Sequence, residues 1–280
     1  MDIQRLEIYI FSPTGTTQRI TRAIADGIAP REIIEHDLTQ AASRTHITQP
    51  SEADLVILAA PVYYGRLPES AVPLFRQLTG AGKAVVPVVV YGNREYDDAL
   101  IELQDICVEQ GFMPVAAGAF IGEHSYSGPN RPMAEGRPDA ADLAKAAAFG
   151  IRIRETLDAV EGPVAFPPLH LPGNRPYLVP ERLIMLKKIK ETIPFTPETD
   201  TEICTQCGIC TDACPEDAID SCDVTDIDRW KCILCFACVK SCPEQAKVFT
   251  EPNFNAAVDQ MALAIAGRKE PDVFFSESQD

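Results

Sequence analysis

Residues 204–218 read CTQCGICTDACPEDA, and residues 232–246 read CILCFACVKSCPEQA. Both stretches follow the spacing C-x-x-C-x-x-C-x-x-x-C-P, so the second is an internal repeat of the first. Together they hold eight of the ten cysteines in this chain of 280 residues. In a reducing compartment, cysteines at such spacing indicate metal or redox chemistry rather than disulfide bonds. The repeat therefore predicts a small domain made of two similar halves.

The spacing favours two [4Fe–4S] clusters. Three thiolates on one tight loop can bind three irons of a cubane, and the fourth cysteine, followed by proline, ligates the other cluster. The first predicted ligand set is Cys204, Cys207, Cys210 and Cys242, and the second is Cys232, Cys235, Cys238 and Cys214. Zinc knuckles or a disulfide framework are the alternatives, although zinc has no use for this triple-plus-one pattern.

Over residues 201–250 the repeat resembles bacterial dicluster ferredoxins, with no departure in spacing. The resemblance implies a small α+β, dicluster ferredoxin-like domain. Apolar side chains are expected to shield the clusters from water and so tune their reduction potentials. These are Ile203, Ile209, Ile219, Ile233, Phe236 and Val248. The other two cysteines, Cys107 and Cys222, are expected to be small buried hydrophobic residues.

Upstream of the repeat, short β-rich runs alternate with helical patterns, which is typical of a parallel α/β sheet. Strands are expected at 6–11, 32–36, 54–60, 83–91 and 112–120, and helices at 16–28, 68–78, 97–110 and 139–160. The run DLVILAA at 54–60 is almost continuously apolar, as expected for a central strand covered on both faces. Five strands with crossover helices predict an open, doubly wound parallel sheet.

Composition divides the chain into four parts. Residues 1–161 are predicted to form the α/β domain, which has a usual size for one domain. Residues 162–200 are proline-rich and read as a linker or wrapping arm, interrupted by a helix at 181–191. The cysteine domain at 201–250 is followed by an alanine-rich helical tail with a polar end at 251–280.

A phosphate-binding loop is expected directly after the first strand, where SPTGTT at 12–17 leads into a helix. Hydroxyl and backbone N–H groups there converge on the helix N-terminus. The candidate ligands are Ser12, Thr14, Gly15, Thr16 and Thr17. Neither a Walker Gly-Lys pair nor a G-x-G-x-x-G fingerprint is present. The loop resembles the FMN-phosphate loop of flavodoxins, and an ordinary Ser/Thr-rich N-cap is the alternative.

Two further loops follow the third and fourth strands, at the carboxyl ends where ligands bind in open α/β sheets. They read PVYYGRLP at 61–68 and YGNREYD at 91–97. The candidate flavin-binding residues are Pro61, Val62, Tyr63, Tyr64, Gly65, Tyr91, Gly92, Asn93, Arg94 and Tyr96. Tyr63 and Tyr96 are expected to flank the isoalloxazine ring, because an aromatic ring offers a large flat contact surface. Solvent-exposed turn tyrosines are the alternative for either loop alone.

Over nearly its full length the chain resembles the flavodoxin–ferredoxin fusion family. The resemblance implies a flavodoxin-like FMN domain with a five-stranded parallel sheet, followed by a domain holding two [4Fe–4S] clusters. The family's loop after the fifth strand also resembles GEHSYS at 122–127, followed by GRPD at 136–139. His124 is expected to face the flavin as a proton donor, or Arg137 as an anion clamp. The alternative is a capping loop, with Asp139 as the N-cap of the last helix.

The formal net charge of −16 argues against non-specific nucleic-acid binding, which needs a basic surface. The apolar share of 46% is ordinary for a packed protein. No apolar run approaches the roughly 20 residues needed to cross a bilayer, and Met1–Arg5 lacks the features of a secretory signal. We therefore expect a cytoplasmic protein with no membrane span and no nucleic-acid partner.

These cofactors imply electron transfer. A cubane passes one electron at a time, whereas FMN holds one or two. Joining both cofactors in one chain raises the effective concentration of electron donor and acceptor. We expect an oxidoreductase in which the clusters relay electrons between a low-potential donor and FMN, with a redox protein or small molecule as partner. A pure electron carrier, an NAD(P)H-dependent flavin or quinone reductase and a metal-stabilised binding module are alternatives. The donor, the acceptor, the direction of flow, the potentials and a possible homodimer stay open.

Overall fold

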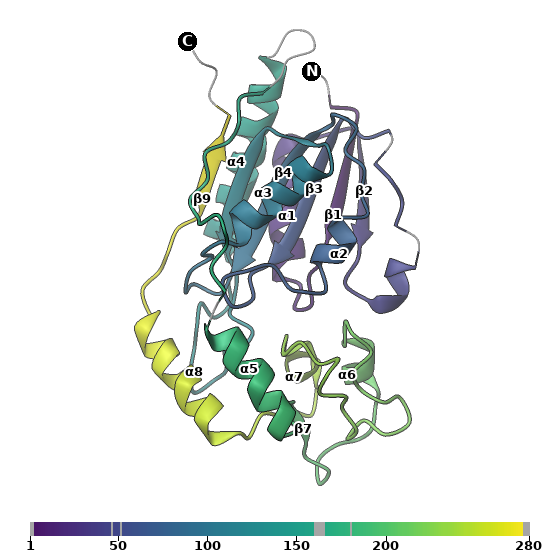
Figure 1. Cartoon of the computed structure of the whole chain (residues 1–280), viewed down its shortest axis with the longest axis vertical. Coiled ribbons are helices and arrows are strands. Elements are labelled where there is room, and N and C mark those ends of the chain that lie inside the picture. The colour runs from purple at the N-terminus through teal and green to yellow at the C-terminus, as the bar shows by residue number, and fades with distance from the viewer. Residues whose placement is uncertain (1–2, 46, 51, 160–165, 180, 277–280) are drawn as a thin grey trace.

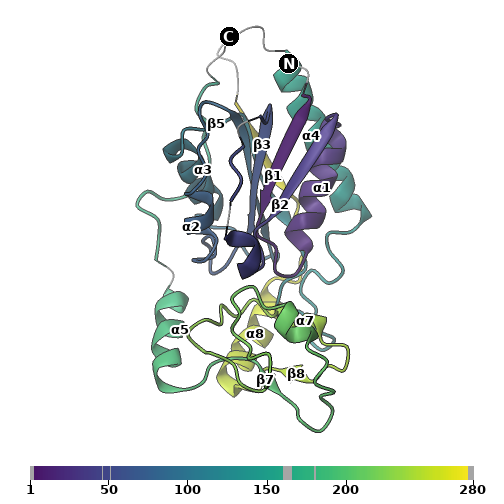
Figure 2. The same cartoon turned by 90° about the vertical axis from the view of Figure 1, so that its right-hand side faces the viewer.

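The structure is a computed structural model that describes residues 3–45, 47–50, 52–159, 166–179 and 181–276. The predicted boundary at 161/162 lies outside these residues. Figure 1 shows an α/β domain with a smaller, cysteine-containing module beneath it. The module lies at the end of the sheet where the parallel strands finish (Figures 1 and 2).

The α/β domain is built on one sheet with the strand order β2-β1-β3-β4-β6-β9, in which β5 also pairs with β4. The strands are β1 (Arg5–Ile10), β2 (Glu32–Asp37), β3 (Leu55–Pro61), β4 (Ala84–Tyr91), β5 (Met113–Pro114), β6 (Ala116–Ile121) and β9 (Asp272–Phe275). All pairs among β1 to β6 are parallel. With β5 and β6 taken as one interrupted strand, the order 2-1-3-4-5 is that of flavodoxin-like sheets. The predicted doubly wound fold with five parallel strands is therefore confirmed, and β9 adds an antiparallel edge strand that was not predicted.

Helices cover both faces of the sheet (Figure 2). On one face α1 (Thr16–Ile28) packs against α4 (Ala140–Asp158), over a buried cluster that includes Ile24 and Phe149. On the other face α2 (Val72–Phe75) and α3 (Ala99–Glu109) cover a second cluster. Between the two layers, β3 and β4 are almost wholly buried, as expected for central strands.

Two expected elements are shorter in the structure. The helix predicted at 68–78 is reduced to the single turn α2, because Pro68 and Pro73 supply no N–H group to a longer helix. The strand predicted at 112–120 is split at Val115 into β5 and β6. A short 3₁₀ helix, η1 (Ala41–Arg44), follows β2.

The C-terminal segment returns to the sheet after its helix α8 (Pro252–Ala264). Strand β9 pairs antiparallel with β6, with Ala116 opposite Phe275. The Phe275 ring packs against Phe149, at a centroid distance of 5.3 Å, and lies beneath the guanidinium of Arg152. The expected helical tail thus ends in an edge strand of the α/β domain.

The module contains short elements around two cysteine-bearing loops. They are β7 (Glu198–Thr199), α6 (Ile209–Asp212), α7 (Ala237–Ser241) and β8 (Lys247–Val248). Strands β7 and β8 pair antiparallel, and α5 (Glu181–Thr192) and α8 flank the module. Among the described residues, no helix is both long and apolar enough to cross a membrane.

Candidate functional site

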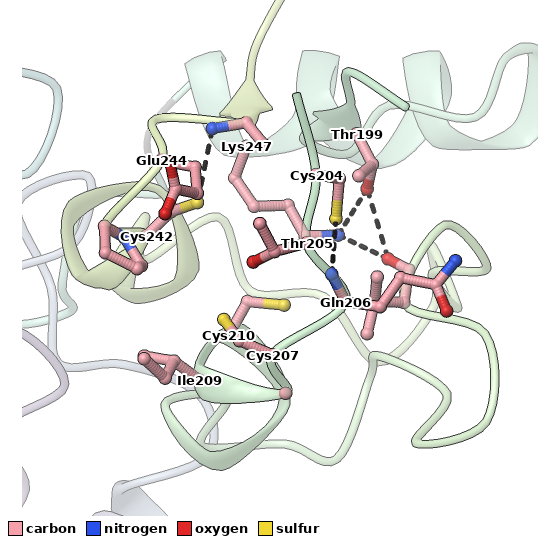
Figure 3. A pocket seen from close by; sticks show the side chains of 14 residues that line it. Thr199, Cys204, Thr205, Gln206, Cys207, Ile209, Cys210, Cys242, Glu244 and Lys247 are labelled. Atoms are coloured by element: carbon pink, nitrogen blue, oxygen red, sulfur yellow. Dashed lines mark hydrogen bonds between the residues drawn. The ribbon is translucent and has the colours of Figure 1, made fainter. Parts of the chain in front are cut away.

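Four thiols surround a first cavity in the module (Figure 3). They belong to Cys204, Cys207, Cys210 and Cys242. Three come from the first run, whereas Cys242 ends α7 in the second half. Thr199 and Lys247, from the β7–β8 pair, also line the cavity. The fold thus brings the last cysteine of one run to the first three of the other.

A second cavity has the reciprocal lining. Its thiols belong to Cys214, Cys232, Cys235 and Cys238. The walls are more apolar and include Ile219, Ile227 and Phe236. The two cavities thus have matching linings, in which each set of four thiols takes three from one run and one from the other. No three of the described His, Cys, Asp or Glu side chains converge on a single ion position.

The two halves share their backbone conformation at corresponding positions. Gln206 and Leu234 are left-handed, with φ of 53° and 56°, and so are Gly208 and Phe236, with φ of 79° and 60°. Non-glycine residues rarely adopt this region, and Phe236 is a bulky example. The internal repeat is therefore a repeat of shape as well as of sequence.

Backbone N–H groups and burial define the surroundings of the sulfurs. The N–H groups of Ala218 and Ala246 donate to Sγ of Cys214 and Cys242, at 3.3 and 3.2 Å. Burial raises the pKa of the Cys238 thiol to about 12 and that of Cys235 well above its usual range. A thiolate in such surroundings is stable only beside a compensating cation.

The expected shielding residues differ between the two cavities. Ile219 and Phe236 are buried beside the second cavity, whereas Ile203 and Ile209 near the first are 48% and 41% exposed. The first cavity is therefore the less screened from solvent.

The remaining two cysteines also differ. Cys107 is buried in α3, as predicted. The prediction for Cys222 is wrong, because this residue is exposed in a turn where its N–H donates to Asp220 Oδ1 at 2.7 Å.

The loop after β1 forms a cradle at the N-terminus of α1. Gly15 is the N-cap, with φ of 77° and open space where a side chain would stand. Ser12 stabilises the loop, because its hydroxyl accepts a hydrogen bond from the N–H of Gln18 at 3.2 Å. Thr17 is 1% exposed, and within the described part of the chain its hydroxyl has no hydrogen-bond partner. An orphaned buried hydroxyl beside the first N–H groups of a helix fits an absent anion.

The cradle contacts the loop after β6. Thr14 and Thr16 are half-buried. A Cβ at Gly122 would lie 2.8 Å from the Cβ of Thr16, so only glycine permits this close approach.

The loop after β3 turns tightly toward the module. Pro61 ends β3, and the N–H of Val62 donates to the carbonyl of Val90 at 2.9 Å. Tyr64 and Gly65 occupy the left-handed centre of the turn, with φ of 56° and 80°.

Tyr63 belongs to this loop and lies close enough to the second thiol set to be affected by the charges of Cys235 and Cys232. Its ring is half-buried, and burial raises the pKa of its hydroxyl well above the usual range. The neighbouring Cys235 thiol raises it further. Tyr63 thus lies where the flavin loops and the second thiol set meet.

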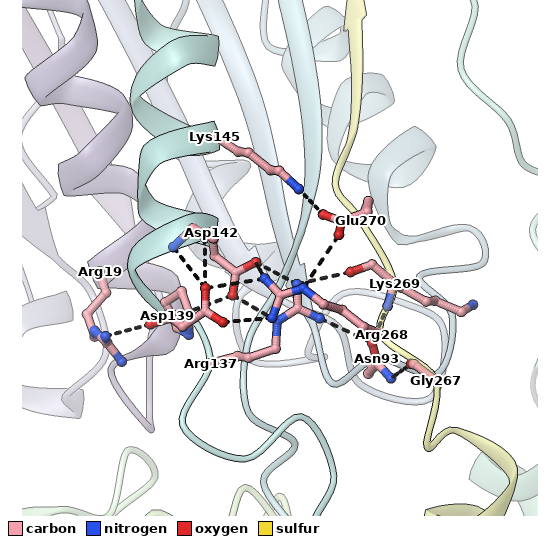
Figure 4. Close-up of polar contacts among 12 residues, drawn as sticks. Arg19, Asn93, Arg137, Asp139, Asp142, Lys145, Gly267, Arg268, Lys269 and Glu270 are labelled. Carbon is pink, nitrogen blue, oxygen red and sulfur yellow. Dashed lines mark hydrogen bonds and ion pairs between the residues drawn. The ribbon is translucent and has the colours of Figure 1, made fainter.

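The loop after β4 is tied to the C-terminal segment, as Figure 4 shows. The Asn93 side chain donates to the carbonyls of Ile265 and Gly267, both at 2.7 Å. Arg94 pairs with Asp97. These side chains therefore hold the loop in place.

The rings of Tyr91, Tyr96 and His124 meet at the loop after β4. Tyr96 is 8% exposed, its ring packs against Tyr91 and its hydroxyl donates to Asp272 in β9 at 2.9 Å. We do not retain Tyr96 as a flavin contact, because the core and β9 already hold it. The Cα of Gly92 is covered by the ring of His124.

The predicted anion clamp is occupied by an ion pair (Figure 4). Arg137 is buried and donates to both carboxylate oxygens of Asp142, at 2.8 and 2.6 Å. The expectation that Arg137 clamps an anionic ligand is therefore wrong. Asp139 is the N-cap of α4 and forms a capping box with Asp142. The alternative interpretation of this segment as a capping loop is therefore confirmed.

His124 is half-buried in the loop after β6. Burial lowers the pKa of its imidazole to about 4, and the charges of Lys240 and Arg94 add to this. Its Nδ1 accepts from the N–H of Tyr126 at 3.1 Å, which leaves the proton of the neutral ring on Nε2. The imidazole is therefore neutral near pH 7. It does not carry the extra proton that the expected role as a proton donor required.

Tyr126 is the residue that the sequence did not single out. Its hydroxyl lies 3.2 Å from that of Tyr64, and its ring lies 4.5 Å from that of Phe236, between centroids. It therefore links a flavin-loop residue to the wall of the second cavity. Its place in the motif GEHSYS was the available signal, but only the fold brings it to the module.

Comparison with known proteins gives one family match and several similar solved structures. Residues 196–253 match the family described as 4Fe–4S dicluster domain. A flavodoxin from the domain Archaea shares 17% identity, over 55% of this chain and 98% of its own, with a TM-score of 0.35. Flavodoxin 2 from Bacillus cereus shares 20% identity, over 54% of this chain and 98% of its own, with a TM-score of 0.40. No curated protein matches the sequence significantly.

The strand order of the sheet and the family match at 196–253 together define the class of protein. The chain is a fusion of a flavodoxin-like α/β domain with a C-terminal 4Fe–4S dicluster domain.

Proposed function

We propose that this protein transfers electrons between an external redox partner and FMN, through two [4Fe–4S] clusters in its C-terminal module. The observation that carries the proposal is the reciprocal lining of the two thiol cavities, beside a phosphate cradle in the same chain. Clusters supply one-electron transfer, and a flavin supplies one- or two-electron chemistry.

Each cavity would hold one cluster through its four thiols. Cys204, Cys207, Cys210 and Cys242 would form one ligand set, and Cys232, Cys235, Cys238 and Cys214 the other. The N–H groups of Ala218 and Ala246 offset negative charge on one sulfur of each set. The apolar walls exclude water, most completely around the second set.

The cradle at 12–17 would hold the FMN phosphate. The Thr17 hydroxyl and the first N–H groups of α1 are its donors, and Gly15 leaves the space open. Tyr63, in the loop after β3, would be the aromatic residue that contacts the isoalloxazine ring. The backbone after β4 would contact the polar edge of the ring.

The external partner is a redox protein or a small-molecule donor or acceptor. Residues 196–253 contain twelve Asp or Glu and only four Lys or Arg, so a basic surface on the partner would favour association. This charge disfavours nucleic acid as a partner. We place the protein in the cytoplasm, where its cysteines stay reduced for cluster assembly.

Anaerobic stopped-flow spectroscopy tests the proposal. The loaded protein is mixed with a limiting amount of dithionite, and cluster and flavin absorbance are followed separately in dilute solution. We expect bleaching of the clusters first, followed by reduction of the flavin at a rate independent of protein concentration. Cluster reduction that is never followed by flavin reduction within one chain rules out the relay.

A further inference from the structure

We infer that the two clusters have a fixed order, in which the cluster held by Cys214, Cys232, Cys235 and Cys238 is the one that exchanges electrons with the flavin. The inference deepens the proposed function and rests on it. An aromatic bridge, defined as Tyr64, Tyr126 and Phe236, joins the two sites.

The contacts between the module and the α/β domain gather beside the second cavity. Arg44 in η1 pairs at 3.1 Å with Glu216, two residues after Cys214. Lys240 in α7 pairs at 2.5 Å with Glu123, in the loop after β6. The Arg44 link is specific to the second ligand set, because Arg44 also donates to the carbonyl of Pro215 at 2.7 Å. Lys240 lies between Cys238 of the second set and Cys242 of the first.

The first cavity has no such links. Among the described residues, none at 199–212 or 242–248 forms a hydrogen bond, ion pair or ring contact with residues 3–159. Cys207 is exposed, and so are Ile203 and Ile209. The first ligand set therefore faces solvent on the side of Cys207, where a partner protein can reach it, although Cys210 is buried.

The aromatic bridge connects the loop after β3 with the wall of the second cavity. The hydroxyl groups of Tyr64 and Tyr126 are 3.2 Å apart, and the rings of Tyr126 and Phe236 are tilted by 55° at 4.5 Å. Phe236 follows Cys235 directly and lines the second cavity. Electron tunnelling decays more slowly through packed atoms than through open space, so this continuous contact favours transfer.

The conformation of Phe236 supports a specific role for its ring. The corresponding residue of the first half is Gly208, and both have positive φ. A glycine satisfies this turn without strain, whereas a phenylalanine does not. The second half thus keeps a bulky ring at a position where the fold alone prefers glycine.

The electron balance follows from this order. An external one-electron donor protein is oxidised at the solvent-facing cluster, and the electron passes to the second cluster and then to the flavin. Two such passages reduce the flavin by two electrons, with protons taken from water.

Two matched cysteine variants test the order. Cys207→Ser and Cys235→Ser alter the second cysteine of each run, and each variant is expected to lose one cluster. The EPR spectrum and midpoint potential of the surviving cluster are measured with and without FMN. We expect FMN to change both in Cys207→Ser and neither in Cys235→Ser. The opposite pattern, or equal responses, overturns the order.

Variants that keep all eight thiols test the bridge and guard against misfolding. Phe236→Gly and Tyr126→Leu are expected to slow flavin reduction at least several-fold after the clusters are reduced. Tyr126→Phe keeps the ring contact with Phe236 but loses the hydroxyl contact with Tyr64, and we expect a smaller decrease in rate. Phe195→Leu is the control, because it removes a ring from the same aromatic cluster without lining either cavity. Unchanged rates in both bridge variants refute the bridge. A wild-type protein without flavin or with a single cluster instead refutes the proposed function.

Discussion

The substitution Thr17→Val separates flavin binding from protein stability. Thr17 is 1% exposed, and its hydroxyl has no partner among the described residues. A hydrogen bond to a charged phosphate contributes about 1.5–3 kcal/mol, so its loss weakens FMN binding about 10- to 150-fold. Without FMN the substitution removes an unsatisfied buried hydroxyl, and we expect the free energy of unfolding to rise by about 1 kcal/mol.

Two measurements on flavin-depleted protein check these opposite signs. Quenching of FMN fluorescence gives the affinity, and thermal unfolding gives the stability. Thr21→Val is the matched control, because Thr21 is fully buried on the same helix and its hydroxyl donates to the Gln18 carbonyl at 3.0 Å. This control is expected to keep its FMN affinity. Wild-type affinity in Thr17→Val, or a less stable flavin-free protein, refutes the assignment of the cradle.

Other expectations concern ion pairs and pH. Asp142→Ala strands the buried guanidinium of Arg137 and is expected to lower the free energy of unfolding by about 3–5 kcal/mol in denaturant titrations. Glu109→Ala removes only an exposed pair and should cost at most about 1 kcal/mol; equal losses would contradict the role of burial. His124 has a folded pKa of about 4, below its ordinary 6.5, so the unfolded chain binds its proton first and stability falls as pH drops below 6.5. His124→Asn should flatten this fall in thermal unfolding between pH 7.5 and 5.5, and an unchanged slope would show that another group titrates.

The repeat and the sheet were predictable because their signals are local. Cysteine spacing is fixed by the geometry of ligation, and the apolar runs at 55–61 and 84–91 mark buried strands wherever they occur. The same holds for Asp139, whose capping box lies within four residues.

Contacts between distant segments were not predictable. Tyr96 looked like a flavin contact, but its hydroxyl bonds to Asp272, which lies 176 residues away in a four-residue strand. The pairing of Arg137 with Asp142 spans only five residues, but the sequence did not show that the fold buries both side chains and so commits the guanidinium to this carboxylate. Tyr126 acquires its place only when the module docks beneath the sheet, so sequence spacing could not distinguish it from an exposed turn residue.

The most direct test is the composition of the protein purified without oxygen. Iron, acid-labile sulfide and flavin are assayed on the same folded sample, together with its absorption spectrum. Two cubanes and one nucleotide predict about eight irons, about eight sulfides and about one FMN per chain. A colourless, folded protein, or one that contains zinc in place of iron, would contradict the account.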